Sequence, residues 1–388
     1  MISFLKMKYI LYICKNRLKS TSSNINMSTV TTLEACVVGT KPCAFVTVLM
    51  KNPHYVFGGL VMGYSLRLTK TKHQITCMLT EDLYEEYHEV LETVFDKVFH
   101  IPYITQTIDK LGSKKQEEIY GTWKNVSFTK WQCLALTEYE KICFLDADLL
   151  IVKNIDHLLD LKTPAACFKN CWSDFGRFGS TTNYYEGIKY GDEIKESCIR
   201  QGLADGYVLV AHCVVLTPSA EAYTGFVAYM NGGYKPFTKC ISMVDETSIT
   251  DYMLQMGQTW TQLDYTYNTI PWYINKTNVE YGPEFKTATF NPPKILHYFN
   301  KEKPWIIPRG KWDDIEIWWQ YYDDMKKNIP TTKFKDVFDK LEKFNAKPKS
   351  ICPYCQFVSM VPGATRNKSN HKMIVDGKIT CVGLTGLI

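Results

Sequence analysis

Two aspartates one residue apart, Asp146 and Asp148, follow the apolar run "ICFL". Two like charges at this spacing repel, so each carboxyl resists ionisation unless a cation lies beside it. A divalent metal ion provides that cation, and oxygen ligands suit Mg²⁺ or Mn²⁺, whose coordination is completed by phosphate oxygens and water. The alternative interpretation is that one of the acids caps a following helix. The pair predicts a divalent-cation site.

A histidine and a lysine much later in the chain add groups for the same chemistry. His297 ends the short apolar segment "KILH", and Lys303 follows in "NKEKPW". Imidazole is a ligand of borderline metals such as Mn²⁺, whereas a lysine ammonium neutralises a diphosphate. A histidine on its own is more often structural than a ligand. Together with the two acids, these residues predict one site for a metal ion and a diphosphate.

Alternating strands and helices in the first third of the chain position the two acids. The expected strands are residues 44–50, 74–79 and 97–103, and the expected helices are residues 55–69, 82–95 and 128–139. Such alternation predicts an α/β fold whose mostly parallel sheet is covered by helices on both faces. Open sheets of this kind bind ligands outside the carboxyl ends of their strands. The segment "ICFLDAD" places its two acids at the carboxyl end of an expected strand, which is this edge of the sheet.

The distribution of charge argues against a nucleic-acid partner. The formal net charge is +5, but the residues from Lys326 to the end hold twelve Lys or Arg against four Asp or Glu, a local charge of +8 that leaves −3 for the rest. A mildly acidic body excludes a basic footprint spread over the fold. We therefore interpret the basic end as a solvated surface.

The cysteines and the first residues of the chain indicate a cytoplasmic location. Several of the 14 cysteines, among them Cys77, Cys133 and Cys143, stand inside apolar runs and are expected to be reduced core thiols. Lys6 and Lys8 interrupt the apolar segment at the start of the chain. No membrane anchor is expected from so short an apolar stretch.

Three regions are expected along the chain. Residues 1–41 are interpreted as a flexible N-terminal extension, residues 42–310 as the catalytic domain, and residues 311–388 as a C-terminal helix followed by a basic tail with cysteines. Residues 170–206, rich in glycine and aromatic side chains, are expected to form an elaborated loop region that carries binding residues.

The C-terminal region contains a helix signal and a cysteine pair. Four apolar residues recur at helical spacing and predict a helix packed on the catalytic domain rather than a sugar-binding platform: Ile315, Trp318, Trp319 and Tyr322. Cys352 and Cys355 have the spacing of half a zinc knuckle, but a second closely spaced pair is missing. Zinc is therefore not expected there.

Several segments resemble the glycogenin and galactinol synthase branch of the retaining family 8 glycosyltransferases. They are "AFVTVLM...YVFGGLVMGYSLR", "VLETVFDKV", "TKWQCLALTEYEKICFLDADLLIVKNIDHLLDL" and "HYFNKEKPW". The likeness runs from about Ala44 to Trp305, with a gap around residues 170–206. It implies a GT-A fold, which is Rossmann-like with a mixed sheet, a UDP-sugar donor and Mn²⁺, with Mg²⁺ as the other candidate ion.

The resemblance also implies roles for individual residues. On the family pattern Asp146, Asp148 and His297 are the metal ligands, and Asp245 and Lys130 are the candidate catalytic residues. The residues that it implies for binding the donor are Thr47, Val48, Asn52, Tyr55, Lys130, Asp146, Ala147, Asp148 and Lys303. Of these, Thr47, Val48, Asn52 and Tyr55 are expected at uracil and ribose, and Lys303 at the diphosphate.

The chain departs from the family pattern at several positions. The usual Asn-Ala/Ser-Gly triplet reads Val210, Ala211 and His212, so contacts to the donor sugar are in doubt. The usual Asp-Gln pair reads Asp245 and Glu246, and Asp245 could also cap the helix that follows. The remaining differences are Asn300 where Gly is usual, and Val279 at the best-aligned position of the tyrosine that glycogenin glucosylates, with Tyr281 two residues away.

We expect a Mn²⁺-dependent glycosyltransferase that moves a hexose from a UDP-sugar to an acceptor hydroxyl with retention. The acceptor is a carbohydrate, a polyol or a protein, and a homodimer is a possible assembly. One alternative is a catalytically impaired relative that binds a nucleotide-sugar or a glycan. Another is a phosphatase of the haloacid dehalogenase type, although its Asp-x-Asp motif normally opens the domain, and here a long α/β pattern precedes it.

Overall fold

The computed structural model describes residues 41–342 and a hairpin near the C-terminus. Within 41–342 it leaves out residues 112–113, 169–183, 233, 235–242, 272–292, 300–302, 308 and 310–312. The hairpin strands are β10 (Lys372–Val375) and β11 (Lys378–Cys381). Residues 1–40 of the N-terminal extension, Val279, Tyr281, Asn300 and the pair Cys352 and Cys355 lie outside the described residues, so the predictions made for them stay predictions.

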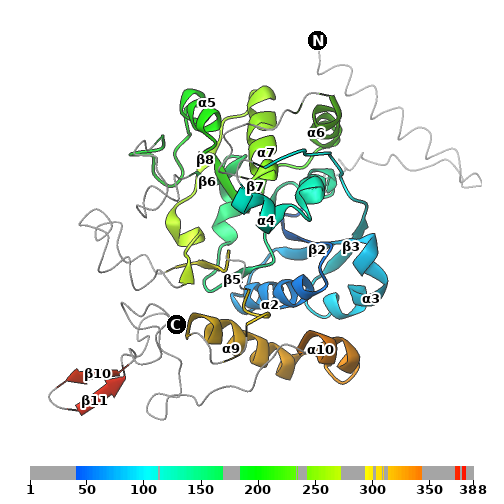
Figure 1. Cartoon of the computed structure of the whole chain (residues 1–388), viewed down its shortest axis with the longest axis vertical. Coiled ribbons are helices and arrows are strands. Elements are labelled where there is room, and N and C mark those ends of the chain that lie inside the picture. The colour runs from blue at the N-terminus through cyan, green and yellow to red at the C-terminus, as the bar shows by residue number, and fades with distance from the viewer. Residues whose placement is uncertain are drawn as a thin grey trace, which may run out of the picture. The chain divides into compact units, whose positions relative to one another are not determined.

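A seven-stranded mixed sheet forms the centre of the fold (Figure 1). Its strands, in spatial order, are β3 (Lys97–Ile101), β2 (Gln74–Thr80), β1 (Ala44–Leu49), β4 (Ile142–Leu145), β7 (Leu209–Leu216), β6 (Ala165–Phe168) and β8 (Thr261–Gln262). The first four are parallel to one another, β7 is antiparallel to both of its neighbours, and β6 pairs with β8 in parallel. The three strands expected at the start of the chain are confirmed.

A second, two-stranded sheet continues from the end of β4. Its strands are β5 (Leu149–Ile151) and β9 (Ile295–His297), which run antiparallel with Leu149 opposite His297. The apolar run around the two acids is therefore not one strand. It is interrupted at residues 146–148, where the chain leaves one sheet and enters the other.

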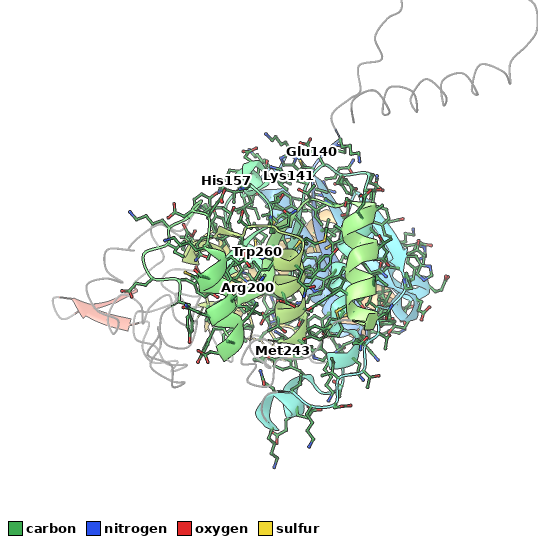
Figure 2. All side chains as sticks on the ribbon, turned by 90° about the horizontal axis from the view of Figure 1, so that it is seen from above. Glu140, Lys141, His157, Arg200, Met243 and Trp260 are labelled. Carbon is green, nitrogen blue, oxygen red and sulfur yellow. The ribbon has the colours of Figure 1, made fainter. Side chains whose placement is uncertain are left out.

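Helices cover both faces of the central sheet, as expected. One face is covered by α2 (His54–Leu68), α3 (Glu81–Leu91), α9 (Asp313–Asn328) and α10 (Lys335–Leu341). The other face is covered by the 3₁₀ segment η2 (Lys124–Ala135), α5 (Glu196–Asp205), α6 (Ala220–Gly232) and α7 (Val244–Gln255). The helix α4 (Lys114–Tyr120) precedes η2, and Met243, labelled in Figure 2, is the residue just before α7.

Two expectations about helices were inaccurate. Residues 128–139 were expected to be an α-helix, but η2 begins earlier and is a 3₁₀ segment whose side chains are almost all buried, so tertiary packing outweighs helix propensity there. The expected loop at 170–206 contains α5. Ile199 and Leu203 are buried one turn apart on that helix, and Gly206, with φ of 81°, ends it in the left-handed conformation.

The aromatic helix after the last site motif is packed as predicted. The four residues of α9 that recur at helical spacing are buried, and the rings of Phe57 on α2 and Tyr322 on α9 meet edge to face at 5.6 Å. These rings therefore belong to the core and not to a binding surface. Among the residues that the structure describes, no helix combines the length and the apolar character needed to cross a membrane.

Candidate active site

The turn between β4 and β5 carries the two acids and is held by backbone hydrogen bonds. The N–H of Asp146 donates to the carbonyl oxygen of His212 on β7 at 2.8 Å. The N–H of Tyr298 donates to the carbonyl oxygen of Asp148 at 3.0 Å. Because no helix follows this turn directly, the interpretation of the pair as a helix cap is wrong.

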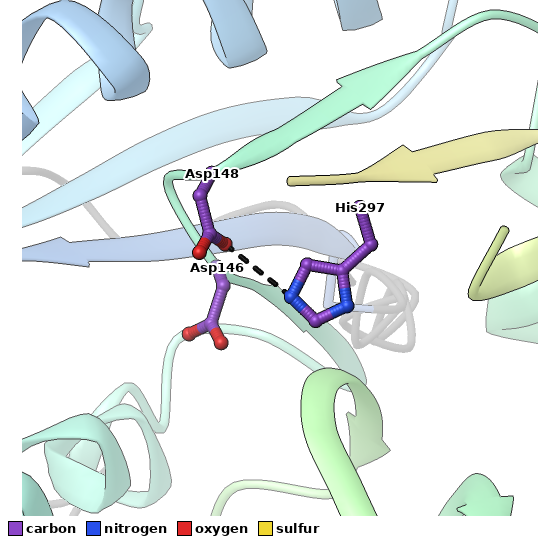
Figure 3. Close-up of side chains that lie close together, drawn as sticks. All are labelled: Asp146, Asp148 and His297. Carbon is purple, nitrogen blue, oxygen red and sulfur yellow. Dashed lines mark ion pairs between the residues drawn. The ribbon is translucent and has the colours of Figure 1, made fainter. Parts of the chain in front are cut away.

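The three predicted metal ligands converge at this turn (Figure 3). One ligand atom from each of Asp146, Asp148 and His297 lies within 4.8 Å of the other two. The dashed line in Figure 3 joins Nε2 of His297 to Oδ1 of Asp148, which are 3.6 Å apart. That Oδ1 atom is buried and accepts no hydrogen bond from the described part of the chain. An unpaired buried carboxylate oxygen beside an imidazole fits a divalent cation.

The orientation of His297 also suits metal binding. Its Nδ1 lies 2.8 Å from Oδ1 of Asn268, an oxygen that can only accept a hydrogen bond. The proton therefore resides on Nδ1, and Nε2 turns its lone pair toward the carboxylates. In histidines that bind metals, the ring nitrogen that does not bind the metal commonly donates its N–H to a nearby oxygen.

Each acid also has a lysine beside it, of which Lys303 is buried and Lys130 is half-buried. The Lys303 ammonium lies 2.5 Å from Oδ2 of Asp148 and donates to the carbonyl oxygen of Tyr298 at 2.8 Å. The Lys130 ammonium lies 3.0 Å from Oδ1 of Asp146 and 3.2 Å from Oδ2 of Asp245. Acids and cations therefore alternate through a buried network, in which ion pairs are strong when each charge keeps its partner.

The environment separates the pKa values of the two acids. Burial raises the pKa of Asp146 to about 6, with Lys130 opposing and Asp148 adding to the rise. Burial also acts to raise the pKa of Asp148, but Lys303 and His297 outweigh it and hold that pKa at about 2. The pKa of His297 is well below its ordinary value, chiefly because of burial. Asp148 is therefore ionised and His297 neutral near pH 7, as a metal site requires.

The fourth predicted polar group near the acids, Asp245, lies in the first turn of α7. The N-cap of α7 is Met243, and its N–H donates a hydrogen bond to the Glu246 carboxylate at 2.8 Å. The interpretation of Asp245 as the cap is therefore wrong. Asp245 instead shares Lys130 with Asp146, and its Oδ1 is buried without a partner among the described residues. This oxygen therefore retains an unused capacity to accept a hydrogen bond.

The residues predicted to contact the nucleoside lie at the same edge of the sheet. Thr47 and Val48 are buried near the end of β1, and the Thr47 hydroxyl has no partner among the described residues. Asn52 is exposed, and its Oδ1 accepts the N–H of His54 at the start of α2. The ring of Tyr55 lies 6.0 Å from the Lys303 ammonium. Their role in nucleotide binding stays a prediction.

Helix α2 approaches the Asp-x-Asp turn closely at one glycine. A Cβ atom on Gly58 would lie 2.5 Å from the carbonyl oxygen of Ala147, the residue between the two acids, and 2.5 Å from the ring of Trp305. Only a glycine fits between these groups. The small residues of this helix were the available sequence signal for Gly58, whereas no local signal pointed to Asn268.

Comparisons with known proteins agree with this geometry. Residues 46–198 match the model of Glycosyl transferase family 8. The chain is 39% identical to "Uncharacterized protein R707" of Acanthamoeba polyphaga mimivirus, over 34% of this chain and 46% of that protein. It is 32% identical to "Glycogenin-1" of Homo sapiens, over 42% of this chain and 45% of that protein. The chain thus spans about half the length of these two relatives.

A solved structure was also matched, the glycosyltransferase GlyE of Streptococcus pneumoniae TIGR4. It aligns with 80% of this chain and 67% of its own at 14% identity, with a TM-score of 0.41. The mixed sheet confirms the expected α/β fold, and the Asp-x-Asp turn follows β4 as the resemblance implied. Residues 46–198 are therefore similar to glycosyl transferase family 8, and glycogenins are among the proteins that this chain resembles.

Proposed function

We propose that this chain is a retaining glycosyltransferase that moves a hexose from a UDP-sugar to an acceptor hydroxyl and depends on Mn²⁺, with Mg²⁺ as a weaker substitute. The observation that supports it best is the cluster of Asp146, Asp148 and His297 with a lysine beside each acid. Two acids and an imidazole suit a divalent cation, and a lysine that remains buried beside them suits a diphosphate.

The ion would be held by the three clustered ligands and would stabilise charge on the departing diphosphate. Lys303 is bonded to Asp148 and to the carbonyl oxygen of Tyr298, which leaves one ammonium hydrogen for a phosphate oxygen. Burial strengthens such a charge-assisted bond because little water competes for it. Lys303 is therefore assigned to the diphosphate.

The transfer itself needs positioning more than a covalent step on the protein. The acceptor oxygen forms a bond to the anomeric carbon, the bond from that carbon to the diphosphate oxygen breaks, and the acceptor proton passes to a diphosphate oxygen. Asp245 is suited to accept a hydrogen bond from a sugar or acceptor hydroxyl through its unpartnered Oδ1, while Lys130 holds it in place. Groups fixed in this way lower the barrier by orientation and electrostatics.

The donor and the acceptor are proposed only as classes. The donor is a UDP-hexose, as is implied for relatives of glycogenin, and the acceptor is a carbohydrate, a polyol or a protein hydroxyl. His212 occupies the position where the resemblance implies glycine beside the donor sugar, and its ring is buried. This side chain favours a second candidate, a relative that binds the nucleotide-sugar but transfers it poorly.

A thermal-shift panel followed by a turnover assay tests the proposal. We expect UDP to raise the melting temperature only when Mn²⁺ is present, and at least one UDP-hexose to release UDP when an acceptor mixture is added. Stabilisation by UDP and Mn²⁺ without release of UDP from any donor identifies the poorly catalytic relative. An absence of any response to UDP with Mn²⁺ contradicts both.

A further inference from the structure

A second histidine packs against the metal-binding one. His212, on β7, is 1% exposed, and its ring stacks on the ring of His297 with 4.7 Å between centroids and 16° between planes. Nε2 of His212 lies 2.8 Å from the carbonyl oxygen of Tyr267. Because that oxygen only accepts, Nε2 carries the proton and is committed to this bond.

One short turn anchors both rings. The carbonyl oxygen of Tyr267 accepts from His212, and the side-chain oxygen of the next residue, Asn268, accepts from Nδ1 of His297 at 2.8 Å. The carbonyl oxygen of the residue after that, Thr269, accepts the backbone N–H of His297 at 2.8 Å. Three successive residues therefore hold the two stacked histidines.

The backbone of His212 contacts the same cluster at Asp146. Its carbonyl oxygen accepts the N–H of Asp146 at 2.8 Å. A single residue thus supports the first acid through its main chain and the imidazole through its side chain. The two contributions are separable, because a substitution at this position removes the ring and keeps the carbonyl.

We propose that His212 is a positioning residue for His297, which fixes the plane of that ring so that Nε2 faces the cation. The proposal rests on the metal site of the proposed function. Asn268 fixes one edge of the His297 ring through the hydrogen bond at Nδ1. A second contact is needed to stop the ring from tilting about that hydrogen bond. The stacked face of His212 provides it. His212 is not itself assigned as a ligand, since the cluster comprises only Asp146, Asp148 and His297 among the described residues.

The choice of metal provides a readout that general loosening of the fold would not change. Imidazole contributes more to the binding of Mn²⁺ than of Mg²⁺, which prefers oxygen ligands. If His212 acts through His297, its loss weakens Mn²⁺ more than Mg²⁺. Loss of a group that orients a ligand typically lowers metal affinity by about 10-fold or more.

The experiment measures the Kd values of the full chain for Mn²⁺, by electron paramagnetic resonance, and for Mg²⁺, by competition. We expect His212→Ala to weaken Mn²⁺ by about 10-fold and Mg²⁺ much less. In a His297→Ala background, removal of His212 should cause no further loss, because the residue then has nothing to position. His212→Phe keeps a ring in the stack and should lie closer to wild type than His212→Ala.

The matched control is His157→Ala. His157, labelled in Figure 2, lies 2.5 Å from the hydroxyl of the same Tyr267 and is absent from the metal cluster, so its loss should leave both Kd values unchanged. Equal weakening of Mn²⁺ and Mg²⁺ by His212→Ala, or additive effects of His212→Ala and His297→Ala, would overturn the role of His212 and leave the metal site intact. Failure of the wild-type chain to bind either ion overturns both.

Discussion

Substitution of Asp148 by asparagine tests the site most directly, because the two acids of the motif differ in their surroundings. From the sequence alone, removing one of two repelling charges is expected to cost little stability. The structure changes this expectation, since Asp148 is paired with the buried Lys303 at 2.5 Å. Asp148→Asn leaves that ammonium buried without its counter-charge, whereas Asp146→Asn leaves Lys130 with Asp245. Asp146→Asn is therefore the matched control.

The pKa values give the magnitude and the sign. Asp148 has its pKa lowered from 3.8 to about 2, so ionisation of this group stabilises the fold above pH 4 by roughly 2 kcal/mol, at about 1.4 kcal/mol per pKa unit. That stability is lost as the pH falls through 2. The pKa of Asp146 is raised to about 6, so ionisation of Asp146 opposes folding above pH 6. In metal-free protein at pH 7.5, Asp148→Asn should lose about 2 kcal/mol, and Asp146→Asn should lose none or gain.

Urea unfolding in EDTA measures this difference, and the Mn²⁺-dependent melting shift with UDP measures the loss of metal binding. Both variants should lose the shift with UDP, because each removes one ligand. Equal stability of the two variants in EDTA would refute the pairing of Asp148 with Lys303. A normal response of Asp148→Asn to UDP and Mn²⁺ would refute the metal assignment itself.

Four further outcomes are expected. Lys303→Ala should weaken UDP by at least 10-fold more than uridine, because the lost cation serves the diphosphate; equal losses in a calorimetric titration would remove Lys303 from that role. Gly58→Ala should destabilise the chain by about 1–3 kcal/mol in urea unfolding, since its Cβ meets Ala147 and a tryptophan ring. Trp318→Ala should cost about 3–5 kcal/mol without changing the affinity for UDP. Transfer should retain the anomeric configuration by NMR, and a hexosyl adduct on Asp245, seen by intact mass with a slow donor, would contradict direct transfer without a covalent intermediate.

The strands and the first helices were predictable because their signal is local. The burial of β1 and β2 on both faces gives the continuous apolar runs that a central parallel strand needs, and these runs stand in the sequence. The 3₁₀ segment η2 was not predictable, since its geometry follows from side chains buried on nearly every side rather than from helix periodicity. The helix α5 was missed because glycines and aromatic residues around it obscured two buried positions one turn apart.

The candidate site was predictable to the extent that each proposed ligand stands in a recognisable local sequence pattern. Two acids after an apolar strand are a local pattern, and His297 is brought to them by one register, in which Leu149 pairs with His297 across β5 and β9. The groups that orient the ligands have no such pattern, because Asn268 and His212 reach the cluster only through contacts between segments far apart in the chain. The same contacts explain why the histidine at position 212 need not disable the site. It occupies space where the resemblance implies glycine, but its ring also stacks on that of His297. Its effect on transfer therefore depends on whether the donor sugar needs that space more than the proposed metal site needs that support.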